Sequence, residues 1–351
     1  MRGDTDSRLG LQLNYAPNSA FEFVGQALIA NREPSASASD AIEWAFAAYR
    51  PNGATTLRLG RLNFDEFLMS DYRNVGFAYL AARPPVEYYG SIPSSLDGVD
   101  ATRTWDTGSA LWRAKVFIGR LKEAGAVLDP GYGFSVTREA DGLTLRAGWA
   151  RARFTNITPQ LQAAVAALNE VAALPVPGLA AQANQLTHRL DYEGTRLNYT
   201  TLGLAYEAGA WQWSAEATVV SESPLFSARA GYALLGRSFG PVTVYGIVSG
   251  IASTPALLAA PPWGPELAPL IGPLQAAAAQ ALADGATDAA NRLLRQHTLA
   301  VGLRWNLQPR LALKLQLDDV TIADHGGSLW SAGSAAAAHA RVATVLLDFI
   351  F

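Results

Sequence analysis

The last eleven residues, 341–351 (RVATVLLDFIF), form the pattern that most restricts how this chain can fold. Read with a period of two, one face of this segment carries only apolar residues: Ala343, Val345, Leu347, Phe349 and Phe351. The opposite face includes a carboxylate, Asp348. An apolar face that alternates with a mixed face is typical of a β-strand. The segment therefore predicts a strand that continues to the end of the sequence.

The same alternation recurs along the chain. The predicted outward sets include Leu9, Leu11, Leu13 and Tyr15; Phe21, Phe23, Ala27 and Ile29; Ile42, Trp44, Phe46 and Ala48; Trp211, Trp213, Ala215, Ala217 and Val219; Leu299, Val301, Leu303 and Trp305; and Leu311, Leu313, Leu315 and Leu317. The opposite faces hold Glu, Gln, Asn, Arg, Lys, Thr and Gly, which are a poor lining for a dry core. Trp and Tyr are frequent near the strand ends, as at a lipid–water boundary.

Short and long connections alternate between these strands. Short turns rich in Gly, Pro and Asn occur at residues 16–19, 51–54, 106–109, 140–142, 209–210, 239–241 and 308–310. Long segments occur at about residues 32–39, 65–98, 121–131, 155–193, 252–296 and 324–338. A soluble β-sandwich is the alternative, but it would need two cores and more even connections. The pattern predicts one all-β domain over residues 1–351, a transmembrane antiparallel up-and-down β-barrel with short periplasmic turns and long extracellular loops.

We count 15 or 16 strands. Bacterial single-chain barrels usually have an even number, so we expect a further strand to precede Met1, where no signal peptide is visible. The alternative is a miscounted hairpin among residues 99–150, where the periodicity is weakest. Two of the long loops, 155–193 and 252–296, carry Ala-rich helical inserts. The first helix begins at Thr158-Pro159, and the second covers residues 274–283, with a further turn over 288–295. A plug, a subunit contact and a lid on the rim all remain open as roles for these inserts.

Composition excludes several classes of protein. Half of the chain is apolar, yet no stretch of about 18 to 20 residues is uninterrupted enough for a membrane-spanning helix. The net charge of −3 argues against a nucleic-acid partner. The absence of cysteine excludes disulfides and thiolate metal sites. No cofactor-binding motif is present.

Several segments resemble the proteobacterial general porins. Residues 57–64 (LRLGRLNF), 70–79 (SDYRNVGFAY) and 83–89 (RPPVEYY) resemble a strand and the inward-folded loop of this porin-like outer-membrane family. Residues 6–13 (DSRLGLQL) resemble one of its early strands, and the aromatic ending also resembles such barrels. The resemblance implies a sixteen-stranded homotrimer among outer-membrane lipids, a passive channel for small hydrophilic solutes. The chain departs from the family in its Ala-rich inserts and in lacking the acidic constriction motif of enterobacterial porins.

A charged loop is the candidate for a pore constriction. Residues 65–98 carry Asp65, Glu66, Asp71, Arg73, Arg83 and Glu87. The inward wall positions offer basic partners: Arg58, Arg113, Lys115, Arg146, Arg304 and Lys314. Such a cation on the lipid face at mid-depth costs about 2–4 kcal/mol, which favours the lumen. Opposed charges in a narrow aqueous pore select ions. The alternative is a solvated external loop, but Val75, Phe77, Tyr79 and Leu80 need a surface to pack against.

Other functions have weaker support. We interpret Arg61, Arg151 and Arg153, which break the alternation, as strand-end or bulge positions. The histidines, His188, His297, His325 and His339, lack metal-ligand spacing, and no catalytic motif is present, so we predict that the chain is not an enzyme. The alternative to a channel is a non-conducting barrel that binds a surface partner or assists assembly. An outer-membrane hydrolase is less favoured, with His297 near Thr298 and His339 near Ser334 as its candidates.

Overall fold

A computed structural model describes residues 7–30, 41–65, 67–90, 95–123, 126–221, 227–254, 256–330 and 336–351. Within these residues, 15 antiparallel strands form one sheet in which each strand pairs with its neighbours in sequence. The strands are β1 (Arg8–Tyr15), β2 (Phe21–Ala30), β3 (Ile42–Asn52), β4 (Thr55–Asn63), β5 (Ser95–Asp106), β6 (Leu111–Glu123), β7 (Ala126–Ala140), β8 (Leu143–Phe154), β9 (Arg196–Ala208), β10 (Trp211–Ser221), β11 (Ala228–Phe239), β12 (Val242–Ser253), β13 (Leu294–Gln308), β14 (Leu311–Gly327) and β15 (Ala338–Phe349). The predicted barrel and its strand count are confirmed.

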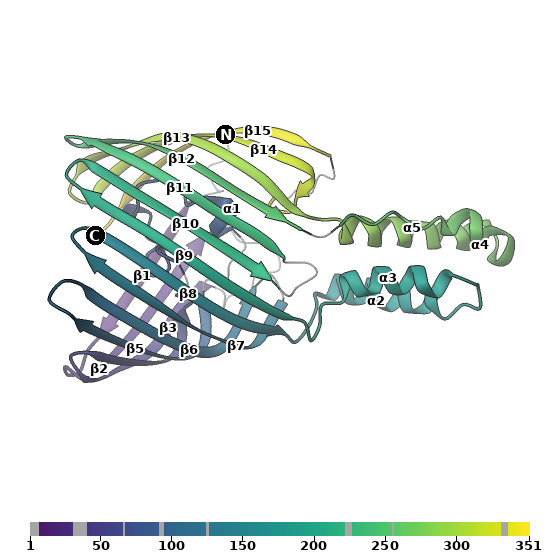
Figure 1. Cartoon of the computed structure of the whole chain (residues 1–351), viewed down its shortest axis with the longest axis horizontal. Coiled ribbons are helices and arrows are strands. Elements are labelled where there is room, and N and C mark those ends of the chain that lie inside the picture. Colours follow the sequence, from purple (N-terminus) through teal and green to yellow (C-terminus); the bar gives the residue numbers. More distant parts are fainter. Residues whose placement is uncertain are drawn as a thin grey trace.

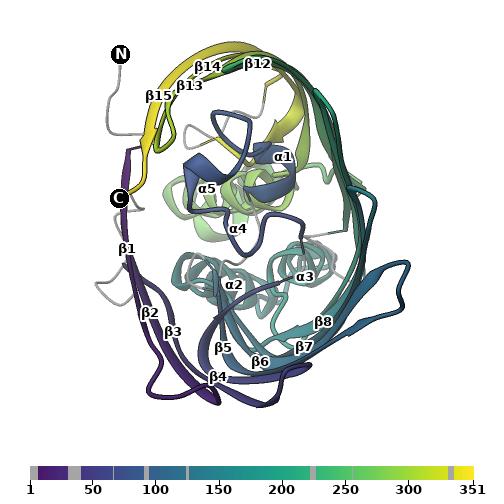
Figure 2. The ribbon, with the colours of Figure 1, turned by 90° about the vertical axis from the view of Figure 1, so that its left-hand side faces the viewer.

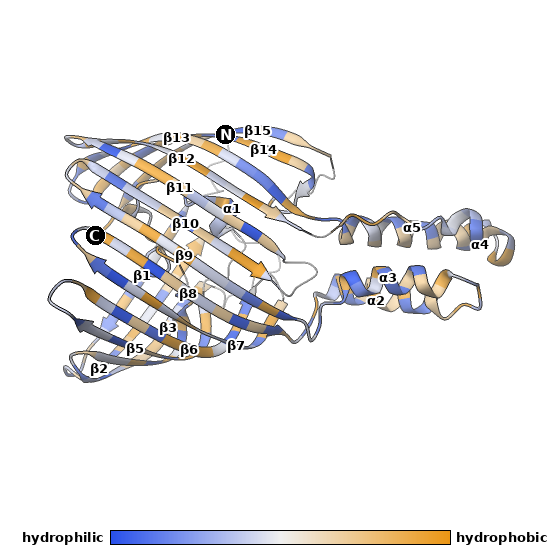
Figure 3. Ribbon diagram, in the orientation of Figure 1, coloured by the Kyte–Doolittle hydropathy of each residue, from blue (hydrophilic) through white to orange (hydrophobic). Residues whose placement is uncertain are grey.

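The sheet curls into a barrel whose end strands, β1 and β15, lie side by side (Figure 2). Each pair is antiparallel, and the described ladders do not join β1 to β15. Apolar residues cover the outer wall, as in Leu13, which is 73% exposed, and Val345, which is 65% exposed. Apolar and polar residues alternate along the strands (Figure 3). This is the wall of a barrel that lies in a membrane.

The predicted outward face of β3 is wrong after its first residue. The register with β2 shifts, so that Gln26 pairs with Trp44 while Ala27 pairs with Ile42. The extra residue, Glu43, reverses the faces that follow. Ile42 is exposed as predicted, but Phe46 lies inside the barrel, where its ring contacts the Arg58 guanidinium at 5.1 Å.

The turn predictions were more accurate than the loop predictions. All seven short connections join neighbouring strands at the predicted places. Gly209 and Gly240 have φ of 58° and 59°, a conformation that suits tight hairpins and favours glycine. The long segment predicted at residues 121–131 is wrong, because β6 continues to Glu123 and β7 begins at Ala126.

Four helices extend beyond the barrel at its long-loop end (Figure 1). They are α2 (Pro159–Ala172), α3 (Leu179–Leu190), α4 (Trp263–Ile271) and α5 (Pro273–Ala290). They share an apolar core that includes Leu168, Leu186, Trp263, Leu267 and Ala283. The helices lie in the two inserts expected, but α3 and α4 were not predicted. The turn expected over 288–295 divides instead between the end of α5 and the start of β13. No helix in the described ranges is long and apolar enough to cross a membrane.

Candidate functional site: the loop inside the barrel

The segment between β4 and β5 folds into the barrel (Figure 2). We call its described part, residues 64–65 and 67–90, the inner loop. It contains a short 3-10 helix, η2 (Gly76–Ala78), and one helical turn, α1 (Val86–Tyr89). Glu66, one of the predicted constriction residues, lies outside the described residues.

An aromatic cluster holds the inner loop against the wall. Phe67, Tyr88 and Tyr89 are buried, and the ring centroids of Phe67 and Tyr88 are 5.3 Å apart. Phe64 packs on Phe117 of β6 with a centroid distance of 5.6 Å. Burying a Phe side chain such as Phe64 or Phe67 stabilises the fold by about 1.5–3 kcal/mol. The predicted alternative of a solvated external loop does not apply to these residues.

Asp65 is the most strongly paired carboxylate of the inner loop. It forms ion pairs with Lys115 of β6 and with Arg146 of β8, the latter at 2.8 Å. All three side chains are buried. Burial alone would raise the pKa of Asp65, but the two cations outweigh burial and hold its pKa well below the usual range. The predicted opposition of loop acid and wall base is therefore present as direct, dry contact rather than across water.

Glu87 in α1 is bound by neutral donors. Its carboxylate accepts hydrogen bonds from Ser249 of β12 at 2.8 Å and from Gln296 of β13 at 2.7 Å. Thr298 of β13 donates a third hydrogen bond. The side chain is buried, so Glu87 fixes α1 to the wall instead of lining open water.

A wall carboxylate makes the reciprocal contact. Glu216 of β10 accepts hydrogen bonds from the Tyr89 hydroxyl, from the Tyr232 hydroxyl at 2.8 Å and from the Leu68 backbone N–H at 2.9 Å. Glu216 is also buried. A carboxylate of the loop, Glu87, thus accepts hydrogen bonds from the wall, and a carboxylate of the wall, Glu216, accepts hydrogen bonds from the loop.

Lys314 of β14 anchors the middle of the inner loop. Its ammonium donates hydrogen bonds to the carbonyl oxygens of Gly76 at 2.6 Å, Tyr79 at 2.7 Å and Ala81 at 2.9 Å. It also pairs with Asp348 of β15 at 3.1 Å. A Cβ on Gly76 would lie 2.3 Å from Asp348 Oδ1, so a larger residue at this position would displace the Asp348 carboxylate from its contact with Lys314.

Arg304 and Arg83 complete the attachment to β13 and β14. Arg304 donates to the Tyr79 carbonyl oxygen at 3.1 Å and lies over the Phe77 ring at 4.7 Å. Arg83 of the loop pairs with Asp318 of β14 at 2.7 Å. Tyr79 is buried, as expected for a side chain that packs against the wall, whereas Val75 is exposed.

Asp71 remains in contact with solvent. Its side chain is 50% exposed, and its carboxylate lies 3.9 Å from the Arg113 guanidinium of β6. Asn63 donates a hydrogen bond to it at 2.5 Å. Arg113 also pairs with Glu139 at 3.4 Å. This is the one predicted pair of loop acid and wall base, among the described residues, in which both partners are substantially exposed.

The remaining predicted residues lie elsewhere. Arg58 pairs with Asp100 of β5, so both partners belong to the wall. Arg73 lies on the inner loop at intermediate exposure. The inner loop does not cover the inner face of β1, where Gln12 and Asn14 are exposed. Gln12 donates to Asn14 at 2.8 Å, and Asn14 donates to Glu22 of β2 at 2.9 Å.

The histidines form no recognisable centre. Within the described ranges, no group of three His, Asp or Glu side chains could hold a metal ion. The pairing of His297 with Thr298 as catalytic residues is wrong, because His297 is exposed on the outer face while buried Thr298 binds Glu87 inside the barrel. His339 contacts Asp319 at 2.5 Å, and Ser334 lies outside the described residues.

Solved structures give the comparison that identifies the fold. OmpF from Salmonella typhi, in a complex with daunomycin, matches with a TM-score of 0.54 and 11% identity over 97% of this chain and 89% of its own. The outer-membrane channel DcaP of Acinetobacter baumannii matches with a TM-score of 0.51 and 10% identity over 99% and 85%. The chain has the fold of the bacterial outer-membrane porins. Pseudomonas putida OprB also matches, with a TM-score of 0.51 and 12% identity over 97% of this chain and 86% of its own.

At the level of sequence, no family model and no curated protein matches the chain. The porin fold is thus shared with little sequence identity.

Sequence reasoning missed the wall's acceptors in this porin fold. Glu216 and Asp318 lie at inward strand positions, so their alternation with apolar neighbours was the available signal. It also missed two glycines that make room for the loop. A Cβ on Gly203 would lie 2.9 Å from Leu68, and one on Gly236 would lie 2.5 Å from Leu80.

Proposed function

We propose that this outer-membrane barrel is a passive channel for small hydrophilic solutes and ions. The observation that carries the proposal is the one-sided attachment of the inner loop. Its contacts go to β6 and to the strands from β8 to β14, and Gly76 also lies against Asp348 of β15. The polar inner side of β1, in contrast, is exposed. A solute path beside β1 and β2 would pass Gln12, Asn14 and Glu22, which offer hydrogen-bond partners without an apolar barrier.

The inner loop, within residues 65–98, is the constriction in this proposal. Asp65, Lys115 and Arg146 pair in a buried cluster. Because these side chains are withdrawn from solvent, they fix the shape of the passage and do not meet passing ions directly. Asp71 and Arg113 are the exposed pair that acts on passing ions. Arg50 and Glu22, which form an ion pair at 2.5 Å on the β2–β3 wall, add charges of both signs. We therefore expect weak ion selectivity.

Liposome swelling tests the transport function. Proteoliposomes that contain the folded barrel should swell in uncharged sugars, and the rate should fall steeply as the sugar becomes larger. Heat-dependent mobility on SDS gels verifies folding in the same preparation. Folded protein that swells liposomes no faster than protein-free controls would favour the non-conducting, surface-binding alternative.

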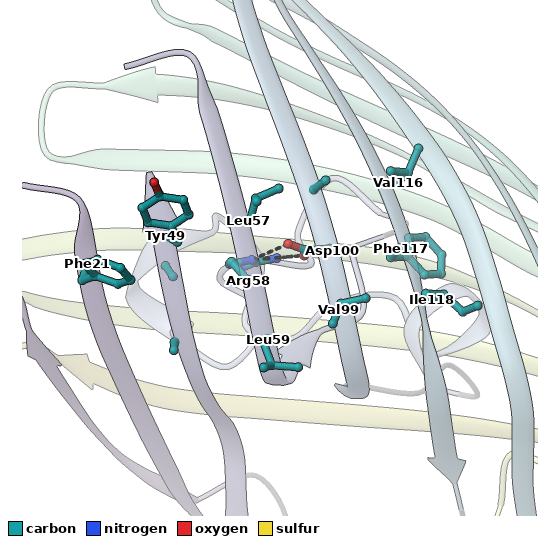
Figure 4. Close-up of a pocket in the computed structure, with 13 residues that line it drawn as sticks. Phe21, Tyr49, Leu57, Arg58, Leu59, Val99, Asp100, Val116, Phe117 and Ile118 are labelled. Carbon is teal, nitrogen blue, oxygen red and sulfur yellow. Dashed lines mark hydrogen bonds and ion pairs between the residues drawn. The ribbon is translucent and has the colours of Figure 1, made fainter. Parts of the chain in front are cut away.

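We also propose that subunits associate, as a homotrimer, through the wall from β2 to β6. A hollow of about 570 Å³ lies on this wall (Figure 4). Its floor includes the small residues Ala47 and Ala101, and its rim includes Phe21, Tyr49 and Val116. An apolar hollow with large apolar neighbours suits packing by a second copy of the same wall.

The association test replaces one small residue. Ala101→Trp should fill the hollow and shift the protein from trimer to monomer on native gels in mild detergent. Ala147→Trp, on the outer face of β8, is the matched control and should leave the oligomer unchanged. A monomeric parent protein, or a trimer that tolerates Ala101→Trp, would contradict this interface.

The helical bundle is proposed to lie outside the cell, as a rigid extension of the channel mouth. Its four helices emerge from the long-loop end, away from the short turns (Figure 1). An epitope inserted between α2 and α3 should be accessible to antibody on intact cells, whereas one inserted in the turn at Gly209 should not.

A further inference from the structure

Two arginines face each other on the outer wall at the long-loop rim. Arg153 of β8 pairs in register with Arg196 of β9, and both are exposed. Arg151 lies two residues before Arg153 and therefore on the same outer face. Like charges directly opposite each other destabilise an antiparallel pair. The arrangement is thus unfavourable for the isolated barrel and favourable once an anion lies between the guanidinium groups.

Aromatic neighbours indicate where these arginines lie relative to the membrane surface. Trp149 of β8 packs on Tyr132 and Phe134 of β7, with centroid distances of 6.0 Å and 6.1 Å. Tyr132 and Phe134 are exposed on the outer wall. Such rings mark the boundary between hydrocarbon and headgroups. Arg151 is two residues beyond Trp149, roughly 7 Å along the strand, which places it and Arg153 at the level of lipid headgroups.

The basic surface extends to β6. Arg120 and Lys122 are exposed there and lie on the same outer face as Ile118. Asp129 of β7 pairs with Arg120 at 3.0 Å. In the described part of the chain, no carboxylate lies within ion-pair distance of Arg153 or Arg196. From β6 to β9 the surface spans three strand spacings, roughly 15 Å.

We propose that this outer basic cluster, defined as Arg120, Lys122, Arg151, Arg153 and Arg196, binds the phosphate groups of a lipid headgroup. Guanidinium groups bind phosphate oxygens in a bidentate manner. The apolar wall below the cluster, including Phe134 and Ile118, offers a surface for the acyl chains of the same molecule. This continuity of basic rim and apolar wall favours a phosphorylated lipid over a free anion.

The test uses lipid A as the probe, because it carries phosphate groups on an acylated headgroup. Folded protein in neutral detergent is titrated with lipid A, with its dephosphorylated form and with inorganic phosphate. Bound lipid is counted by native mass spectrometry, and the unfolding temperature is recorded. The cluster variant is Arg153→Gln with Arg196→Gln. Its control is Arg229→Gln with Arg310→Gln, which removes the same charge from exposed positions outside the cluster.

We expect the cluster variant to bind lipid A at least about tenfold more weakly than the parent protein, while the control binds as the parent does. Without lipid, the cluster variant should unfold at the same temperature as the parent or higher, because the like-charge pair is gone. Equal binding by the cluster variant, or equal binding of dephosphorylated lipid by the parent, would overturn the proposal. Inorganic phosphate that stabilises the parent as much as lipid A does would show a free-anion site instead.

Discussion

The ammonium of Lys314 lies 2.7 Å from the carbonyl oxygen of Tyr79, so that a fully buried lysine of the wall holds the middle of the inner loop. The same ammonium binds the carbonyl oxygens of Gly76 and Ala81. In water a lysine would be an exposed charge, but here backbone oxygens and Asp348 replace its hydration. Lys314 therefore fixes the position of residues 76–81 of the inner loop.

Replacing Lys314 with methionine should release this part of the loop. The change removes several charge-assisted hydrogen bonds and should lower the free energy of unfolding by about 3–5 kcal/mol. Open-channel current noise should rise, because residues 76–81 lose their fixed position. Arg229→Met, at an exposed position of β11 outside the inner loop's contacts, is the control. If Lys314→Met kept both the stability and the quiet current of the parent, the anchoring role would be wrong.

Asp65 gives a prediction on pH. Its pKa is lower in the folded chain than the value of about 3.9 in an unfolded one. Its stabilisation is therefore present above about pH 4 and is lost as the pH falls through the lower folded pKa. At pH 7, Asp65→Asn should lower the free energy of unfolding by about 3–5 kcal/mol, since it leaves Lys115 and Arg146 buried without their counter-charge.

That difference between Asp65→Asn and the parent should shrink in strong acid. Unfolding in urea from pH 7 down to pH 2, about the practical limit, measures it. Asp97→Asn is the control, because Asp97 pairs with Arg61 at the exposed surface. A difference that stays constant across this range would show that Asp65 is not titrating as the structure implies.

Neutralising Asp71 and neutralising Arg113 should shift the ion preference of the channel in opposite directions. Asp71→Asn removes an exposed negative charge and should move the reversal potential in a salt gradient toward anion preference. Arg113→Gln should move it toward cations. Each shift should be a small part of the roughly 59 mV that full selectivity gives for a tenfold gradient of a monovalent ion. Shifts of the same sign for both variants would exclude their role as an opposed pair.

The strands could be predicted because lipid imposes a simple rule on them. In the middle of β14 and β15 the outward positions are apolar, so Leu313, Leu315, Val345 and Leu347 reveal the faces directly. A single inserted residue breaks the rule, as Glu43 does in β3. The pattern carries no sign of such a bulge until the partner strand is known.

The candidate site was predicted only in part. The six wall bases do lie inside the barrel, since each contacts an interior group. Their contacts could not be predicted, because Lys314 binds backbone carbonyl oxygens and Glu87 binds neutral side chains, neither of which shows as charge pairing in a sequence. Whether a carboxylate such as Asp65 meets water or a buried cation depends on how the loop packs.

The proposed channel function requires a water-filled passage beside β1. The chain contains no cysteine, so single cysteines can be introduced at adjacent positions on opposite faces of this strand. Gln12→Cys should expose its thiol to the passage, whereas Leu11→Cys should place it in lipid. In planar bilayers, both variants should show ohmic current steps. A bulky charged methanethiosulfonate reagent should reduce the current of Gln12→Cys alone; folded protein without current steps, or equal reduction in both variants, would contradict the account.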